Sequence, residues 1–325
     1  MRPTLHTMSK EIIPYAEASK VTQLAPGVFL ANLSANFCIG SVPNGGYVAS
    51  TIIRAAAEHL ASRGQTDSIT SHFEFIDRTE PGPALIILED VKLGRSVSTL
   101  HATLYQNDLQ PTAPFITPRT RKLLLSYLTN ASLAREQGLT LDTQWTLTPP
   151  PPPPPARLAL LATDAAPGWT ARSPRFRSRS PLVRSNDNLQ CFFPTTAPRR
   201  GQEDVWLRLA SGERLTNAAL AYIVDSMPYL VEGWRPAADE PQTPYRTDDV
   251  WWYPTLVLNL DIKRGLPAEG VEWLFMRTMA REIRNGRFDL EVTILDEQGN
   301  LVALASHVNM ILSMARNMKK RTEKL

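Results

Sequence analysis

Cysteine and paired histidines are scarce in this sequence. Its 325 residues include two cysteines, Cys38 and Cys191, and five histidines. Neither cysteine has a second metal ligand at a useful spacing, and no HExxH motif occurs. A disulfide framework is therefore excluded, and a structural zinc site is disfavoured. We expect no bound metal.

Long apolar runs and a strong net charge are also missing. No stretch approaches the roughly 20 apolar residues that span a bilayer, and the N-terminal region lacks the pattern of a secretory signal. The formal net charge is only +3, and the short basic tracts at 172–184 and 319–321 carry no nucleic-acid-binding signature. We predict a soluble, intracellular protein that binds neither nucleic acid nor membrane.

The end of the chain bears on the compartment. Lys324-Leu325 match the last two residues of the peroxisomal SKL address, whereas Glu323 stands where a small residue is expected. We therefore expect a cytoplasmic or a peroxisomal protein.

Proline is abundant, and its distribution divides the chain. Seven consecutive prolines, 149–155, cannot donate sheet hydrogen bonds and favour an extended rod. The sequence stays rich in Pro, Ser and Arg to about residue 200. We interpret 149–200 as a linker and surface excursion between an N-terminal domain, 1–148, and a C-terminal domain, 201–325.

The N-terminal half begins its regular pattern with a helix. Asn44-Gly45-Gly46 precedes an apolar stripe of four-residue spacing that predicts a helix over 47–62. Alternating patterns then predict strands, at 68–76, 84–93, 97–106 and 123–130. The irregular stretch 108–122 holds three prolines. We interpret it as an insertion loop, although an error in the gene model would look the same.

The C-terminal half repeats this order. A short strand at 206–209 precedes a predicted helix over 215–233, and further strands are predicted at 254–262, 273–283, 287–295 and 301–312. A helix followed by several antiparallel strands, twice over, is an α+β plan with two antiparallel sheets, each wrapping its own long helix. No GxGxxG or GxxxxGK[ST] motif supports a nucleotide-binding α/β fold.

Several short motifs are familiar in this order and spacing. They are PNGGY at 43–47, SHFEF at 71–75, GRS at 94–96, LAYIVD at 220–225, Thr255 ahead of NLD at 259–261, and LVA at 301–303 leading to His307. Together they resemble the acyl-CoA thioesterase II-like superfamily, and 130–145 resembles its fungal branch. The resemblance implies a tandem (double) hotdog fold.

The same resemblance implies an active site of Asp, Thr and Gln that orients a water toward a thioester. Asp225 and Thr255 match the first two positions, whereas His307 replaces the Gln. A histidine can also transfer a proton near neutral pH. The replacement is therefore compatible with hydrolysis, with an altered mechanism, or with another reaction.

The apolar periodicity gives an independent prediction of the face on which each of these three side chains lies. It places Asp225 opposite the apolar stripe of its helix, Thr255 opposite the row Leu256, Leu258, Leu260 and Ile262, and His307 opposite the row Val302, Leu304, Val308, Met310 and Leu312. Three residues that line a shared cleft would all lie opposite their apolar faces in this way. The alternatives are a carboxylate that faces solvent, a threonine that is present for its strand propensity, and a histidine on the surface.

Other residues are candidates for binding the substrate. Asn44, Gly45 and Gly46 could present free N–H groups of a helix N-terminus to an oxyanion, or could form a simple N-cap. Trp252, in the cluster Trp251-Trp252-Tyr253, could line an acyl pocket or belong to the core.

These observations lead to a functional hypothesis. We expect a thioesterase that hydrolyses an acyl-CoA or carrier-bound acyl group, in fatty-acid or secondary metabolism, by means of an activated water. The absence of a GxSxG nucleophile motif disfavours an α/β-hydrolase with a serine nucleophile. The alternatives are a hotdog dehydratase, isomerase or cyclase acting on a polyketide-like intermediate, and a non-catalytic acyl-binding protein. We expect no cofactor beyond the coenzyme A or phosphopantetheine of the substrate. The resemblance leaves a homo-oligomer open.

Overall fold

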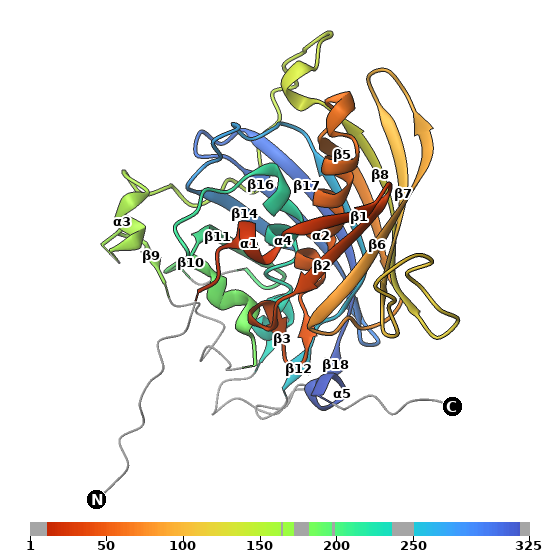
Figure 1. Cartoon of the computed structure of the whole chain (residues 1–325). Helices are drawn as coiled ribbons and strands as arrows, with labels where there is room; N and C mark the ends of the chain where they lie inside the picture. The colour runs from red at the N-terminus through yellow and green to blue at the C-terminus, as the bar shows by residue number, and fades with distance from the viewer. Residues whose placement is uncertain (1–11, 164, 172–181, 197–198, 236–249, 319–325) are drawn as a thin grey trace, which may run out of the picture.

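The computed structural model describes residues 12–163, 165–171, 182–196, 199–235 and 250–318 (Figure 1). The C-terminal residues on which the peroxisomal expectation rests lie outside this part, as does most of the basic tract 172–184. No helix in the described part is long and apolar enough to cross a bilayer.

One large antiparallel sheet dominates the fold. Its N-terminal strands are β1 (Val21–Ala25), β2 (Val28–Leu33), β5 (Asp67–Phe75), β6 (Gly82–Leu93), β7 (Ser98–Gln106) and β8 (Arg121–Ala131). Its C-terminal strands are β9 (Trp169–Thr170), β10 (Leu189–Pro194), β11 (Gln202–Leu209), β13 (Thr255–Ile262), β14 (Leu274–Met279), β15 (Ile283–Arg284), β16 (Arg287–Leu295) and β17 (Leu301–Met310).

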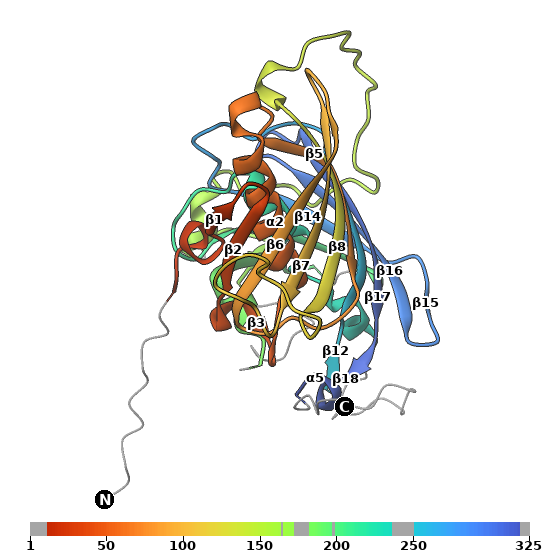
Figure 2. The same ribbon diagram turned by 45° about the vertical axis from the view of Figure 1, so that its right-hand side comes forward.

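The two halves join in the middle of this sheet. The strand order is β1-β2-β6-β7-β8-β5-β13-β17-β16-β14-β11-β10-β9. β5 and β13 pair across the junction, from Glu74 opposite Val257 to Thr70 opposite Asp261. The predicted α+β, double-hotdog plan is confirmed, with the two half-sheets continuous (Figures 1 and 2).

Short elements complete the fold. They are α1 (Tyr15–Ala18), η1 (Ala35–Phe37), β3 (Cys38–Ile39), β4 (Val42–Pro43), η2 (Ala61–Arg63), η3 (Leu133–Arg135), α3 (Ala159–Ala162), η4 (Arg184–Asn188), β12 (Trp251–Trp252), β18 (Leu312–Ser313) and α5 (Met314–Met318). The hairpin β1–β2, which is not among the predicted strands, turns at Gly27, where φ is +70°. A glycine tolerates that angle without strain.

The N-terminal helix agrees with the prediction. α2 (Gly45–His59) begins at the Asn44 cap, and its Val48, Ile52 and Ala56 are fully buried against the inner face of the sheet. Burial extends nearly around its first ten residues, because a second helical segment packs on the side that the sheet leaves free. α2 is thus the central core helix.

The predicted long helix over 215–233 is wrong. The structure has a 3-10 turn η5 (Asn217–Ala219), a short α4 (Leu220–Val224) that ends at Asp225, and a 3-10 segment η6 (Tyr229–Trp234). Pro228 explains the break, since proline cannot donate an intrahelical hydrogen bond and disfavours helical backbone in the preceding residue. Among the residues that the structure describes, only the N-terminal half-sheet therefore wraps a long helix, and Asp225 lies at a helix end.

The described part of 149–200 is more than the expected linker. β10 lies within it and pairs with β11 along Leu189–Phe192. Trp169 packs in a second apolar cluster with Trp273, and its indole Nε1 donates to the carbonyl of Pro153 at 3.1 Å. The proline run thus belongs to a segment that packs on the C-terminal half. The loop 108–120 lies between β7 and β8 and is held by its own hydrogen bonds, such as Thr120 Oγ1 to the carbonyl of Asp108 at 3.0 Å.

Candidate active site

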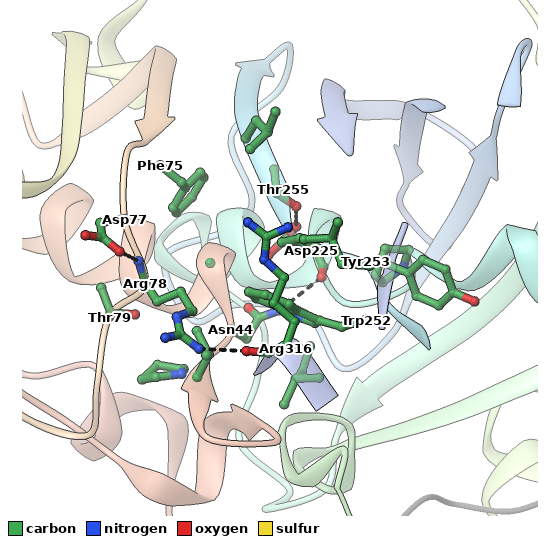
Figure 3. A pocket seen from close by; sticks show the side chains of 18 of the residues that line it. Asn44, Phe75, Asp77, Arg78, Thr79, Asp225, Trp252, Tyr253, Thr255 and Arg316 are labelled. Atoms are coloured by element: carbon green, nitrogen blue, oxygen red, sulfur yellow. Dashed lines mark hydrogen bonds between the residues drawn. The ribbon is translucent and has the colours of Figure 1, made fainter. Parts of the chain in front are cut away.

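A cavity of about 620 Å³ lies where the two halves meet (Figure 3). Its lining comes from the start of α2, the segment that follows β5, the end of α4, the strands β12 and β13, and the C-terminal segment. Most lining side chains are apolar, among them Ile39, Val42, Phe75, Trp252 and Leu312. Its volume and largely apolar wall are those of a small-molecule site.

Asp225 lies in the wall of this cavity with only 4% of its surface exposed. Its Oδ1 accepts a hydrogen bond from Thr255 Oγ1 at 2.8 Å, and its Oδ2 accepts from the backbone N–H of Gly46 at 2.7 Å. The alternative of a solvent-facing carboxylate is therefore wrong. The two bonds hold both carboxylate oxygens in place at the start of α2.

Thr255 reaches Asp225 because β13 is irregular at its start. The register shifts between Thr255 and Val257, and Leu256, which was expected in the core, is 40% exposed. A bulge of this kind reverses the side-chain alternation over one residue. Thr255 therefore faces inward, on the side of the core residues Leu258 and Leu260, and not away from them as predicted.

Asn309 fixes the direction of the threonine hydroxyl. Its amide Nδ2 donates to Thr255 Oγ1 at 3.1 Å, and the residue is fully buried. Because a hydroxyl has a single hydrogen, Thr255 accepts from Asn309 and donates to Asp225. Asn309 is not among the residues predicted for the site, although its position two residues after His307, on the same face of a strand, was a usable signal.

His307 is close to Asp225 but does not reach the cavity. Its Nδ1 lies 3.5 Å from Asp225 Oδ1, its side chain has no exposed surface, and it is not among the lining residues. Within the described part of the chain, neither ring nitrogen has a hydrogen-bond partner. The three predicted residues thus come together, but His307 lies behind the carboxylate and not in the wall of the cavity.

The predicted orientation of His307 is also wrong, and the cause is the composition of β17. Its inward face carries Ala305, His307 and Asn309, all buried, whereas Leu304 and Val308 on the opposite face are partly exposed. The larger aliphatic residues are therefore on the outer face, because the inner face accommodates the polar site. A periodicity that assumes apolar side chains inside is inverted here.

The Asn44–Gly46 turn joins the two halves. Asn44 Oδ1 caps α2 by accepting from the N–H of Tyr47 at 2.8 Å, and its Nδ2 donates to the backbone carbonyl of Asp225 at 3.0 Å. The simple N-cap is confirmed. The N–H of Gly46 donates to Asp225 Oδ2, and the N–H of Tyr47 donates to Asn44 Oδ1. The N–H of Gly45 is therefore the donor left in the first turn of α2, and Gly45 lines the cavity.

Gly46 is required by the packing of the two helices. A Cβ there would lie 2.1 Å from the carbonyl oxygen of Ala221 and 2.6 Å from Cβ of Asp225. Such contacts are far inside van der Waals distance. The glycine therefore lets α2 approach α4 closely enough for its N–H to reach Asp225.

Aromatic residues close the side of the cavity that faces the protein interior. Trp252 lines the cavity and is 8% exposed, so it is both a core residue and a wall of the pocket. Burial, and then the charge of Asp225, raise the pKa of Tyr229, so that its hydroxyl stays protonated beside the site.

The described residues include no cluster of three or more His, Cys, Asp or Glu side chains that could hold a metal ion.

Comparison with known proteins agrees with this fold. The model of an acyl-CoA thioesterase N-terminal domain matches residues 33–118, and that of an acyl-CoA thioesterase C-terminal domain matches residues 149–311. The chain therefore belongs to the acyl-CoA thioesterase family. The resemblance found in the sequence is confirmed.

One curated relative and two solved structures illustrate the relationship. The thioesterase-like protein TwmA of Talaromyces wortmannii is 39% identical over 329 residues, which cover 95% of this chain and 94% of TwmA. A structure described as a thioesterase II of Thermobifida fusca has a TM-score of 0.68 at 19% identity, covering 93% of this chain and 99% of that chain. A conserved hot dog protein of Alicyclobacillus acidocaldarius has a TM-score of 0.68 at 17% identity, covering 92% and 98%. The two structures share the fold.

Proposed function

We propose that this protein hydrolyses an acyl thioester, carried on coenzyme A or on phosphopantetheine, with a water activated by Asp225. The observation that carries the proposal is the buried Asp225 carboxylate in the wall of an apolar cavity, held by Thr255 and by the N-terminus of α2. A fixed base beside a space for an acyl chain is what water attack on a thioester requires.

The proposed reaction proceeds by addition and elimination. Asp225 takes a proton from a bound water, and the resulting hydroxide attacks the carbonyl carbon of the thioester. The N–H of Gly45 donates to the oxyanion that develops on the carbonyl oxygen. The C–S bond then breaks, and the leaving sulfur takes the proton from Asp225. The products are a carboxylic acid and a free thiol.

The remaining polar residues act through Asp225. Thr255, oriented by Asn309, holds the carboxylate oxygen Oδ1, and Gly46 holds Oδ2. His307 Nδ1 lies 3.5 Å from the same oxygen, behind the carboxylate. We assign it as a positioning residue, in the place that the family resemblance gives to a glutamine. These steps use no cofactor beyond the carrier that belongs to the substrate.

The geometry favours hydrolysis over dehydration or isomerisation. A dehydratase would need the imidazole to exchange protons with the substrate, and His307 does not line the cavity. An acyl-binding protein without activity would need the cavity but not an oriented carboxylate. The polar network around Asp225 is therefore the feature that favours an enzyme.

Thiol release from a panel of acyl-CoA and acyl-N-acetylcysteamine thioesters tests the proposal. We expect Asp225→Asn to lower kcat by about 10²–10⁴-fold, the contribution of a general base. Thr255→Val should lower it strongly, and Thr255→Ser, which keeps the hydroxyl, much less. Asp261→Asn is the matched control, because Asp261 lies on the same strand as Thr255 but pairs with Lys263 outside the cavity.

Two results would contradict the proposal. One is unchanged thiol release by a folded Asp225→Asn variant. The other is a wild-type protein that consumes a hydroxyacyl thioester with loss of water and an intact C–S bond. Circular dichroism and melting temperature identify variants that have merely unfolded.

A further inference from the structure

The cavity contains positive charge that the proposed reaction does not use. Its charged lining residues are Asp77, Arg78, Asp225 and Arg316. Asp77 is paired with Arg121, and Asp225 is hydrogen-bonded within the site. The two arginines therefore give the cavity an excess of positive charge.

Neither arginine is neutralised by an acid in the described part of the chain. The Nη1 of Arg78 donates to the backbone carbonyls of Arg316 at 3.0 Å and Asn317 at 3.1 Å, which are uncharged acceptors. The guanidinium of Arg316 makes no hydrogen bond or ion pair with the residues that the structure describes. In Figure 3 its side chain extends across the cavity toward the end that holds Thr255 and Asp225.

The position of Arg316 is built into the fold. The adjacent Asn317 is fully buried, its Oδ1 accepts from the N–H of Ser41 at 3.0 Å, and its Nδ2 donates to the carbonyl of Ile39 at 2.9 Å. A Cβ at Gly40 would lie 2.1 Å from Asn317 Oδ1, so this attachment also depends on a glycine. α5 is thereby fixed beside β3, at the same end of the molecule in both views (Figures 1 and 2).

We infer that Arg316, supported by Arg78, binds an anionic group of the substrate, either a carboxylate or a phosphate. A guanidinium presents paired N–H donors that match the oxygens of both groups. The anion has two sources, a carboxylate at the far end of the acyl chain or a phosphate of the carrier. The inference rests on the proposed function for its choice of an acyl thioester.

Binding of stable thioether analogues tests this without requiring turnover. Four ligands are titrated by calorimetry: a neutral S-alkyl chain and an ω-carboxyalkyl chain of equal length, each on coenzyme A and on N-acetylcysteamine, which lacks phosphates. Arg316→Gln is compared with the wild type, with Arg316→Lys, and with the control Arg284→Gln, whose side chain is 75% exposed and pairs with Glu282. Arg316→Gln should fold normally, since the substitution removes no hydrogen bond or ion pair within the described part of the chain.

We expect Arg316→Gln to weaken the anionic ligands by about tenfold or more, the loss of a hydrogen bond between charged groups. Arg316→Lys should recover part of the affinity, and Arg284→Gln should change nothing. Weakening of both ω-carboxylate ligands, whatever the carrier, assigns the acyl carboxylate. Weakening of both coenzyme A ligands, whatever the chain, assigns the phosphate.

Three outcomes would overturn the inference. They are a change below twofold for all four ligands, an equal loss that includes the uncharged N-acetylcysteamine ligand, and a wild-type protein that binds none of the charged ligands. Hydrolysis of neutral acyl-N-acetylcysteamine is measured separately. Failure of catalysis and failure of anion binding are therefore distinguishable.

Discussion

A methyl group at Gly46 tests the packing that brings the two halves of the site together. The added Cβ of Gly46→Ala would lie 2.1 Å from the carbonyl oxygen of Ala221, and this oxygen belongs to the backbone of α4. A rotamer change cannot relieve that overlap, so α2 and α4 must separate. The hydrogen bond from Gly46 N–H to Asp225 would then lengthen or break.

The size of the effect follows from three contributions. Overpacking costs about 1–3 kcal/mol, and loss of a hydrogen bond to a charged group costs about 1.5–3 kcal/mol. Alanine is favoured over glycine in a helix by about 1 kcal/mol. We expect Gly46→Ala to lower the free energy of unfolding by about 1.5–5 kcal/mol and, for a chain of 325 residues, the melting temperature by about 2–7 °C.

Gly45→Ala is the matched control for stability. A Cβ at Gly45 would lie 3.1 Å from Asp225 Oδ2 and from the ring of Phe75, both of which are side-chain atoms that can move. We expect it to change the free energy of unfolding by less than about 1 kcal/mol, since helix propensity offsets a mild contact. Urea unfolding and calorimetric melting measure both variants. A Gly46→Ala protein as stable as the wild type, or as Gly45→Ala, would refute this account of the helix contact.

Two further predictions concern His307 and the buried tyrosines. His307→Leu should lower kcat about tenfold, because the carboxylate loses a polar neighbour, whereas His307→Gln should keep most of the activity; equal losses in both variants, measured by thiol release, would contradict the positioning role. Burial raises the pKa of Tyr47 to about 12 and also raises the pKa values of Tyr222 and Tyr229. Since the unfolded chain loses these protons near pH 10, their stabilising effect is complete below about pH 10 and is lost above it, by about 1.4 kcal/mol per pH unit for each tyrosine. Urea unfolding at a series of alkaline pH values should show the free energy of unfolding falling as the pH rises above about 10; a free energy of unfolding that stays constant between about pH 9 and pH 11 would contradict this.

The regular elements were largely predictable from the sequence. The strands β5, β6, β7, β8, β16 and β17 lie within about two residues of their predicted ends, and α2 was placed by its apolar stripe and its Asn44 cap. These signals are local, because the alternation of a strand and the cap of a helix depend on neighbouring residues. The short motifs along the chain then indicated the family, which the comparisons confirm.

The orientation of the side chains at the site was less predictable than which residues lie there. Asp225 and Thr255 both line the cavity, but the periodicity placed the strand residues Thr255 and His307 on the wrong face. The bulge after Thr255 turns its side chain inward, and β17 carries His307 on its inner face with Asn309. Pro228, a local signal that was overlooked, ends the second helix at Asp225.

The sequence by itself determined which elements form, which family the chain belongs to and which residue types are available for chemistry. The tertiary structure decided which of them meet. The pairing of β5 with β13 and the contact of Gly46 with Ala221 bring Asp225 to the start of α2, and Asn317 brings Arg316 to the cavity. These contacts join residues more than a hundred positions apart, and their strength depends on distance in space, so no local pattern in the sequence encodes them.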